Sequence, residues 1–181
     1  MYAVVVSERI VFGSSVEGQL RALGPTIAPD VKAQLISLGV NPDKILPGYS
    51  VPIYAKLIDF VGAQRFPELQ GSERDRALGR EFIIGFGNTF VGKATLAMGK
   101  VLGPMRATLR LTRTMRTVNN YSSSEAIPIN ATSVNVWCQP VLRPWYYVGV
   151  FEQAGKQLHG DSYTVELKRF EGERADFLVS W

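Results

Sequence analysis

The periodicity of the apolar side chains changes once along this chain, and that change restricts the fold more than any other feature. Up to about residue 120, apolar residues recur at helical spacing between glycines and prolines. Beyond that point β-branched and polar residues alternate, as in the run that contains Val134, Val136 and Cys138. Helices that are gathered before the strands, rather than alternating with them, predict an α+β fold.

The first block is predicted to hold several helices bounded by capping residues, glycines and prolines. Gly103-Pro104 is the clearest of these breaks. After an extended segment over 2–12, we expect helices over about 16–23, 29–38, 52–64, 72–100 and 104–117. On the longest of these helices, Phe82, Phe86 and Phe90 would share one face.

The second block is predicted to form an antiparallel sheet. We expect strands over 126–130 and 133–139, a helix over 144–158, and a hairpin of 162–170 with 174–181. The order β-β-α-β-β predicts a sheet with helices packed on one face. With 181 residues the chain has the size of one domain. We therefore expect a single α+β domain over 1–181, mainly helical over 1–120 and mainly stranded over 121–181.

Composition excludes several kinds of site. A single cysteine, Cys138, allows no internal disulfide, and a single histidine, His159, allows no multi-histidine metal site. The chain has no Gly-x-Ser-x-Gly elbow and no paired carboxylates in an evident cleft, so we predict no catalytic residue. Its apolar runs are too short to span a bilayer, and it lacks a signal-peptide pattern. A cytoplasmic location is therefore expected.

The segment Gly87–Lys93 nearly matches a phosphate-binding loop. Such a loop needs serine or threonine after the lysine to bind magnesium, and Ala94 stands there instead. The alternative is close helix packing, because Gly85, Gly92 and Gly99 recur every seven residues and small residues let another backbone approach. We favour packing, and we keep a nucleotide-using enzyme as a minor alternative.

Four arginines are spaced to lie along one helix. Arg106, Arg110 and Arg113 would follow one side of it, with Arg116 on the adjoining face. The stripe could hold phosphates, carboxylates or an acidic partner. It could also be a solvated face that pairs with acidic residues, and we favour this interpretation because few cations cluster. With a net charge of +4 and no aromatic residues between the arginines, no nucleic-acid partner is expected.

Aromatic side chains from both blocks could line a ligand cavity, although the same residues could form ordinary core. We expect the polar mouth of such a cavity near Arg106, Arg110 or Asn120. The candidate ligand-binding residues are Phe82, Phe86, Phe90, Arg106, Arg110, Arg113, Asn120, Tyr121, Trp137 and Tyr147.

Short motifs over nearly the whole chain resemble a paralogous myxobacterial family of unknown function. They cover Val11–Gly18, Leu78–Phe82, Leu102–Pro104, Arg113–Tyr121 and Val179–Trp181. The resemblance to this family carries no activity with it.

A wider resemblance rests on the order of the elements. A glycine-bearing helix, strands ending near Trp137, a helix starting at Tyr147–Val150 and a closing hairpin are similar to the superfamily of haem–nitric-oxide-binding, vinyl-reductase-like and Golgi-transport ligand-binding proteins. This implies an α+β domain around an apolar cavity for haem, tetrapyrrole-like or acyl ligands, and frequent dimers. Haem sensors of this superfamily use an axial histidine in the helical half. His159 lies outside that half, so the resemblance implies the cavity and argues against haem.

The sequence thus predicts a non-enzymatic ligand-binding or regulatory module with an apolar cavity, able to form homodimers. Its ligand or cofactor stays unknown, and no metal site is expected. The alternative is a protein–protein interaction scaffold without a small ligand.

Overall fold

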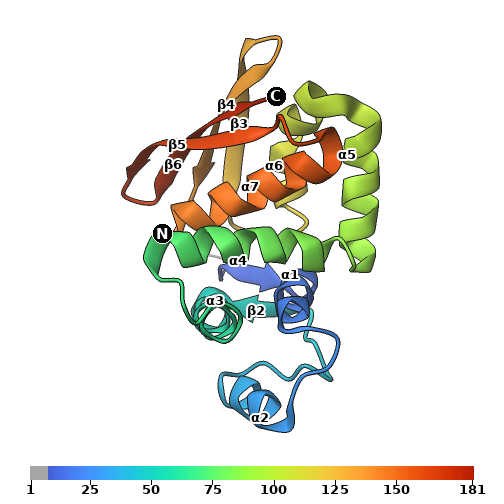
Figure 1. Ribbon diagram of the computed structural model, residues 1–181, viewed down its shortest axis with the longest axis vertical. Helices are drawn as coiled ribbons and strands as arrows, with labels where there is room; N and C mark the ends of the chain where they lie inside the picture. The colour runs from blue at the N-terminus through green and yellow to red at the C-terminus, as the bar shows by residue number, and fades with distance from the viewer. Residues whose placement is uncertain (1–7) are drawn as a thin grey trace, which may run out of the picture.

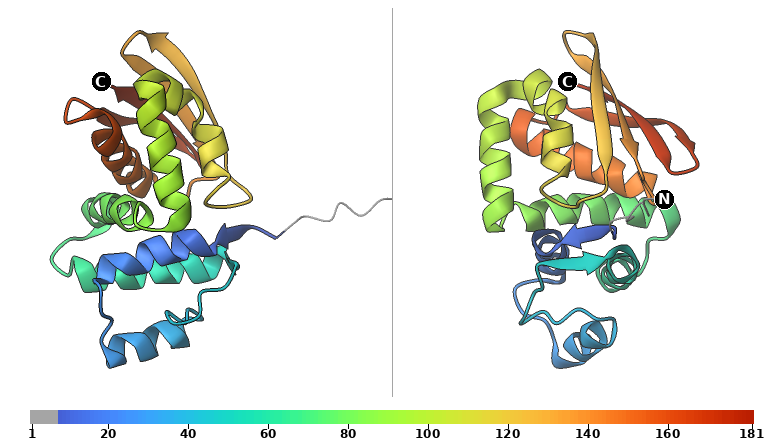
Figure 2. Two further views of the ribbon diagram at one scale, coloured as in Figure 1. Left: turned by 90° about the vertical axis from the view of Figure 1, so that its right-hand side faces the viewer. Right: turned by 180° about the vertical axis from the view of Figure 1, so that it is seen from behind.

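The computed structural model describes residues 8–181, in which a helical part lies on one side of α7 and a sheet on the other (Figures 1 and 2). The helical part contains α1 (Gly13–Leu20), η1 (Arg21–Leu23), α2 (Pro29–Ser37), α3 (Val51–Arg65) and α4 (Gly71–Phe86), with a small sheet of β1 (Ile10–Phe12) and β2 (Gly48–Ser50). The rest contains α5 (Phe90–Leu109), α6 (Leu111–Met115), α7 (Pro144–His159), β3 (Ser123–Asn130), β4 (Ser133–Gln139), β5 (Thr164–Glu171) and β6 (Arg174–Ser180).

The four-stranded sheet has the order β3-β4-β6-β5, and every neighbouring pair is antiparallel. In the central pair Val134 lies opposite Val179 and Val136 lies opposite Phe177, and all four side chains are buried. They face α7, which crosses one face of the sheet in Figure 1. The α+β class and the β-β-α-β-β order that the sequence predicted are therefore confirmed.

Most element boundaries agree with the sequence patterns, because caps and breakers stand at their ends. The helices expected over 29–38, 52–64 and 144–158 are present as α2, α3 and α7. The extended segment expected over 2–12 is a strand only at Ile10–Phe12, and residues 1–7 lie outside the described part of the chain. The three-residue strand β2 was not predicted, since so short a strand has no recognisable period.

The continuous helix expected over 72–100 is wrong. α4 ends at Phe86, and Thr89 begins α5 by accepting a hydrogen bond from the Gly92 N–H at 3.0 Å. Phe82 and Phe86 stack in the core with ring centroids 5.5 Å apart. Phe90 belongs to the next helix and is 90% exposed, so the shared face of three phenylalanines is also wrong.

The crossing of α4 and α7 joins the helical part to the sheet. A methyl group on Gly79 would collide with the carbonyl oxygen of Tyr146, and one on Gly149 would collide with the carbonyl oxygen of Arg76. The two backbones are therefore in direct contact, which only glycine permits at these positions.

No helix of the described residues is long and apolar enough to cross a bilayer.

An ion cluster lies beside this crossing. Glu152 of α7 is 5% exposed, and it accepts hydrogen bonds from Arg76 Nε at 3.0 Å and Arg80 Nη2 at 2.8 Å. Burial alone would raise the pKa of Glu152, but the bonds from the two guanidinium groups outweigh it and lower that pKa. The carboxylate is therefore held in its charged form in the folded protein.

Gly149→Ala should destabilise the fold by about 3 kcal/mol, because α4 and α7 must move apart to admit the methyl group. Gly62→Ala in α3 is the matched control. The atoms nearest to its new methyl group belong to the Arg74 and Leu78 side chains rather than to a backbone, and the nearest, Arg74 Cδ, is at 3.1 Å. Urea unfolding followed by circular dichroism measures both variants. Equal stability of the Gly149 variant and the wild type would contradict the tight crossing.

Glu152→Gln should lower the free energy of unfolding by about 1–2 kcal/mol at neutral pH, since the two arginines are partly exposed and screened. The pKa of Glu152 is lowered in the folded state, so its contribution is present above the unfolded pKa of about 4.3 and is lost as pH falls through the folded pKa. The difference between wild type and variant should therefore shrink in acid. Unfolding curves across pH measure it, and a constant difference would contradict the assignment.

Candidate functional site

A cavity of about 400 Å³ lies where the two apolar clusters of the protein meet. Phe82 and Phe86 come from the cluster of the helical part, and Val136 and Val179 come from the cluster under the sheet. The walls are formed by segments of α1, α3, α4, α5, α6 and α7 and by the sheet. Elements from both halves of the chain are therefore needed to enclose it.

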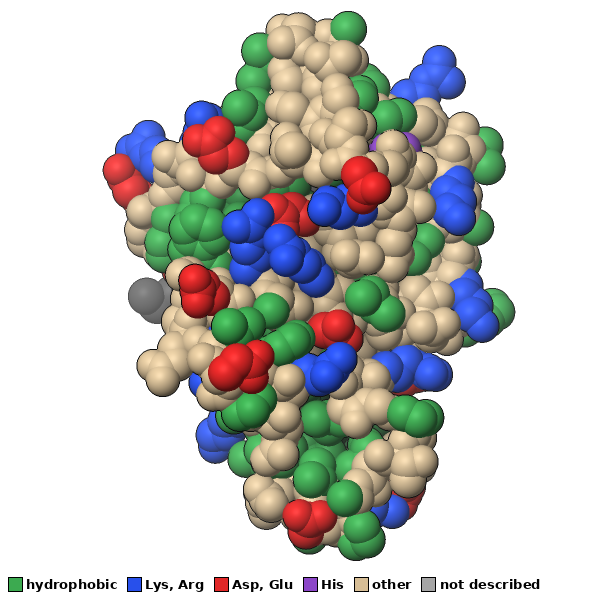
Figure 3. All heavy atoms as spheres, viewed as in Figure 1, with side chains coloured by type: hydrophobic (Ala, Val, Ile, Leu, Met, Phe, Trp, Pro, Cys, Tyr) green, Lys and Arg blue, Asp and Glu red, His purple; other side chains and the backbone are tan. Residues whose placement is uncertain are grey.

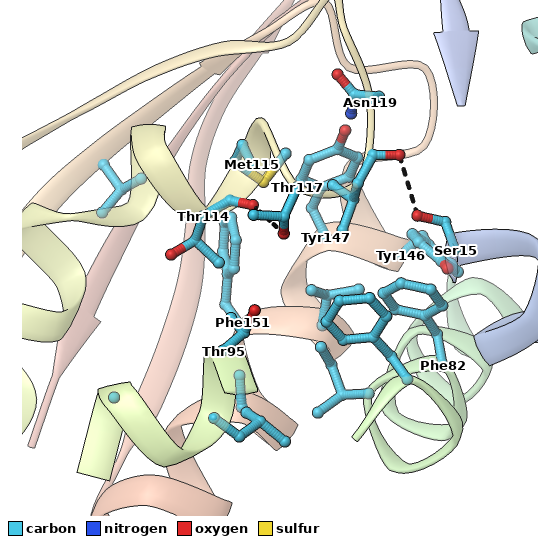
Figure 4. Close-up of a pocket in the computed structure, with 18 of the residues that line it drawn as sticks. Ser15, Phe82, Thr95, Thr114, Met115, Thr117, Asn119, Tyr146, Tyr147 and Phe151 are labelled. Atoms are coloured by element: carbon cyan, nitrogen blue, oxygen red, sulfur yellow. Dashed lines mark hydrogen bonds between the residues drawn. The ribbon is translucent and has the colours of Figure 1, made fainter. Parts of the chain in front are cut away.

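A chain of aromatic side chains runs along the wall formed by α4 and α7 (Figure 4). Phe82 lies 5.9 Å from Tyr146, measured between ring centroids, and Tyr147 lies 5.9 Å from Phe151. The successive turns of α7 thus place Tyr147, Phe151, Ala154 and Leu158 along the cavity. On the facing wall Thr95 of α5 points inward (Figure 4).

The polar groups of the lining are mostly bonded to the protein itself. The Ser15 hydroxyl donates to the Val118 carbonyl at 3.0 Å, and the Thr117 hydroxyl donates to the Thr114 carbonyl at 2.7 Å (Figure 4). Asn119 Oδ1 accepts from the backbone N–H groups that follow it. A ligand in the cavity would therefore meet few polar groups that lack a partner.

A short hydrogen-bond chain begins in the cavity wall and leads to Gln19 of α1. The hydroxyls of Tyr54 and Tyr146 lie 3.2 Å apart, and Tyr146 donates to Gln19 Oε1 at 2.9 Å. Among the described residues nothing bonds the buried Gln19 Nε2. Burial raises the pKa of Tyr54, Tyr146 and Tyr147. These phenols are therefore neutral at physiological pH and can act only as hydrogen-bonding groups.

Arginines reach the cavity from two sides. Arg143 lines it, but its guanidinium donates to Asp59 at 2.6 Å and to Asp75 at 3.0 Å. Burial would lower the pKa of Arg143, but the two carboxylates outweigh that effect and raise it. Arg110 and Arg113 are exposed members of the lining, so the cavity reaches the surface beside α5 and α6.

The arginine stripe on a single helix is wrong. α5 changes direction at Gly103, whose φ is 73°, and it ends at Leu109, so Arg106 and Arg113 lie on different helices. Two acidic residues that could have buttressed the stripe are engaged elsewhere. Glu81 pairs with Arg65, and Glu125 accepts from the Trp137 indole.

The structure brings six of the ten candidate ligand-binding residues to the cavity: Phe82, Phe86, Arg110, Arg113, Tyr121 and Tyr147. The other four lie outside the lining. Phe90 and Arg106 point to solvent from α5. Asn120 instead fixes β1, since its Oδ1 accepts from the Ile10 N–H at 2.8 Å. The Trp137 ring is covered by Arg174, with the guanidinium 4.8 Å from the ring centroid.

Sequence reasoning missed several lining residues. Tyr54 lies on a helix with no other sign of function, and Ser15 lies inside α1, apart from every candidate site residue. Met115, Thr117 and Asn119 come from the irregular chain around α6. None of these positions shares a period with the others, because the cavity is assembled from segments far apart in the sequence.

The near match to a phosphate-binding loop is a turn between two helices. The N–H groups of Gly87, Asn88 and Thr89 donate to carbonyls of the last turn of α4, and the Lys93 N–H donates to the Thr89 carbonyl. These groups are therefore not free to hold a phosphate. Among the three glycines expected in packing, Gly85 faces the Gly18 carbonyl, Gly92 faces the Phe86 carbonyl and Gly99 faces the Leu158 side chain. They do not share one helical face.

The chain's two rarest reactive side chains have different surroundings. His159 ends α7 and lines the cavity, with its ring centroid 5.9 Å from that of Tyr163, and partial burial lowers its pKa. Cys138 is buried under the sheet, which raises the pKa of its thiol to about 12. Within residues 8–181, no group of three or more histidine, cysteine or acidic side chains is placed to hold a metal ion.

Comparison with known proteins agrees with both resemblances read from the sequence. Residues 9–181 match the family model described as "Protein of unknown function (DUF2378)". Among curated proteins none matches the chain in sequence.

Several solved structures, H-NOX domains among them, have the same fold. One, described in work on haem redox potential and protein-induced porphyrin distortion, is 18% identical with a TM-score of 0.60 over 94% of this chain and 99% of that chain. An oxygen-binding H-NOX domain related to soluble guanylate cyclases, in its oxygen complex, is 18% identical with a TM-score of 0.58 over 93% of each chain. A mutant H-NOX of T. Tengcongensis is 16% identical with a TM-score of 0.53 over 92% of this chain and 94% of that chain.

Proposed function

The chain belongs to the DUF2378 family, and we propose that it is a non-enzymatic, cytoplasmic module that binds one apolar or amphipathic small ligand in the cavity between its two halves. The observation that carries the proposal is the cavity itself. A volume of about 400 Å³ lies within the range of small-molecule sites, and the walls are mainly aromatic and aliphatic. A solid core, as expected of a scaffold without a ligand, would leave no such space.

The energetics of packing support an occupant. Protein interiors are packed as densely as organic crystals, and empty apolar space lowers stability in proportion to its volume. Water gains little from a wall such as that formed by Phe82, Tyr147 and Phe151, whose exposed atoms are mostly carbon. An apolar ligand would supply the van der Waals contacts that the walls of an empty cavity lack.

The exposed arginines suggest how a ligand would be oriented. Arg110 and Arg113 stand where the cavity reaches the surface, and neither takes part in an ion pair among the described residues. An anionic group on the ligand would meet these cations while the apolar body filled the interior. The neutral phenols of Tyr121 and Tyr147 offer further hydrogen bonds along the same wall.

A haem held by an axial histidine does not fit the residues present. α5 and α6 contain no histidine, and the ring of His159 packs against Tyr163, which in turn stacks on Trp181 at 6.1 Å. A cysteine or tyrosine ligand does not fit either. The Cys138 thiol is protonated and lies outside the lining, and burial keeps the cavity tyrosines from ionising. The fold of the H-NOX domains is therefore proposed to hold a different ligand here.

Thr95→Trp should weaken ligand binding by about tenfold or more, because the indole would fill the cavity from the α5 wall. The probe is 8-anilinonaphthalene-1-sulfonate, which combines an apolar body with an anion, and its fluorescence titration measures affinity.

Native mass spectrometry of the purified wild type should also show added mass from a ligand carried through purification. The same spectrum reports whether two chains associate, as the superfamily resemblance implies.

Ala97→Trp is the matched control, since Ala97 is exposed on the same helix and does not line the cavity. It should leave probe binding unchanged. Loss of binding in this variant with full binding in Thr95→Trp would place the probe on the outside of α5 and contradict the proposal.

Titration of the protein with haemin should give no saturable one-to-one change in the Soret band, since α5 and α6 offer no imidazole and the ring of His159 packs against Tyr163. His159→Ala should behave as the wild type does. A saturable Soret shift that disappears in His159→Ala would show that the histidine can leave Tyr163 and ligate haem.

A further inference from the structure

Positive charge is concentrated in one stretch of the chain. Residues 82–124 contain six of the chain's 20 lysines and arginines and none of its 16 aspartates and glutamates, so the remainder of the chain carries a slight negative excess. All six cationic side chains are exposed: Lys93, Lys100, Arg106, Arg110, Arg113 and Arg116. None of them forms an ion pair with the described acidic residues.

The first three turns of α5 have an exposed side that is apolar at its centre. Phe90 is 90% exposed and Val101 is 87% exposed, and Ala97 lies between them on the same side of the helix. Lys93 and Lys100 flank this side, so their ammonium groups can extend past the apolar centre. We call these five residues the α5 face. The opposite side of the helix carries the buried Gly92 and Gly99.

The α5 face lies at the outer edge of the molecule. α5 runs along one edge in Figure 1 and along the opposite edge when the protein is seen from behind in Figure 2. In Figure 3 basic and apolar side chains alternate along that edge. The face is thus a protruding ridge that can touch a flat surface without obstruction from the rest of the protein.

We propose that the α5 face docks the protein on an anionic lipid bilayer. Phe90 and Val101 would enter the boundary between headgroups and acyl chains, and Lys93 and Lys100 would lie among the anionic headgroups. The helix would lie in the plane of the bilayer surface.

Other occupants fit this face less well. Pairing with a second copy of the chain through the same face would bring its lysines against those of the partner copy. Nucleic acid attracts cations, but it offers no apolar partner for Val101. A bilayer offers both negative charge and an apolar boundary, and its flat surface matches a protruding ridge.

The inference is independent of the proposed function. The α5 face contributes no residue to the lining of the cavity, which touches the other side of the same helix through Thr95 and Gly99. A variant of the face can therefore lose membrane binding while its cavity still binds the fluorescent probe. Failure of one proposal would leave the other standing.

Flotation of the full chain with vesicles tests the docking. The wild type should float with vesicles of phosphatidylcholine mixed with phosphatidylserine and should stay behind with phosphatidylcholine alone. Lys93→Glu with Lys100→Glu should weaken partitioning by about 30-fold or more, since each lysine near an anionic surface contributes a substantial part of the attraction. Phe90→Ser with Val101→Ser should also weaken it, at unchanged net charge.

Lys44→Glu with Lys56→Glu is the matched control, because both lysines are exposed away from α5 and the change in net charge is the same. This variant should float as the wild type does. Thermal unfolding of all variants should be unchanged, since every substituted side chain is exposed.

Three results would overturn the inference. The wild type could fail to float with phosphatidylserine vesicles. The control variant could lose as much binding as the α5 variant, which would mean that overall charge alone attracts the protein. Full flotation of the serine variant would show that Phe90 and Val101 do not insert and that the attraction to the vesicles is electrostatic alone.

Discussion

The contact between the backbones of α4 and α7 holds the two halves of this protein together. At Gly79 and Gly149 a side chain of any size would force the two helices apart. The helical part would then also move away from the sheet. The carboxylate of Glu152 fixes the same crossing through two arginines of α4. The aromatic wall of the cavity is built on this pair of helices, so its shape depends on how closely they approach.

The crossing also explains why the protein contains a cavity at all. α4 and α7 touch closely along one line, whereas α5 leaves α4 through a sharp turn and returns toward the sheet only after its kink at Gly103. The side chains between these paths, such as Thr95 and Phe151, do not fill the space. Bonds within the protein satisfy most polar groups that border it. Recognition of a ligand would then depend on shape and on the arginines at the surface.

The two sides of α5 face different environments. Its inner side, with Thr95 and Gly99, faces the cavity, and its outer side presents Phe90, Lys93 and Val101 to solvent. If both proposals hold, a single helix separates a ligand site from a membrane surface.

The sequence by itself determined the class of the fold, the order of most elements and the absence of common catalytic and metal-binding patterns. Those features depend on local periodicity, caps and composition, as α7 between Pro144 and Gly160 illustrates. The cap at Thr89 was also readable, but helical spacing on both sides concealed it, and Phe90 was therefore placed on one helical face with Phe82 and Phe86.

Only the tertiary structure decided which side chains meet. Tyr54, Asn119 and Tyr147 are distant in the sequence and share no pattern, yet they line one cavity because three separate segments converge there. Asn120, beside Asn119, turns away to hold β1. Apolar periodicity and helix caps act within a few residues, so they determine where the helices and strands lie along the chain. The cavity depends on how the helices cross, which depends on contacts between residues far apart in the chain.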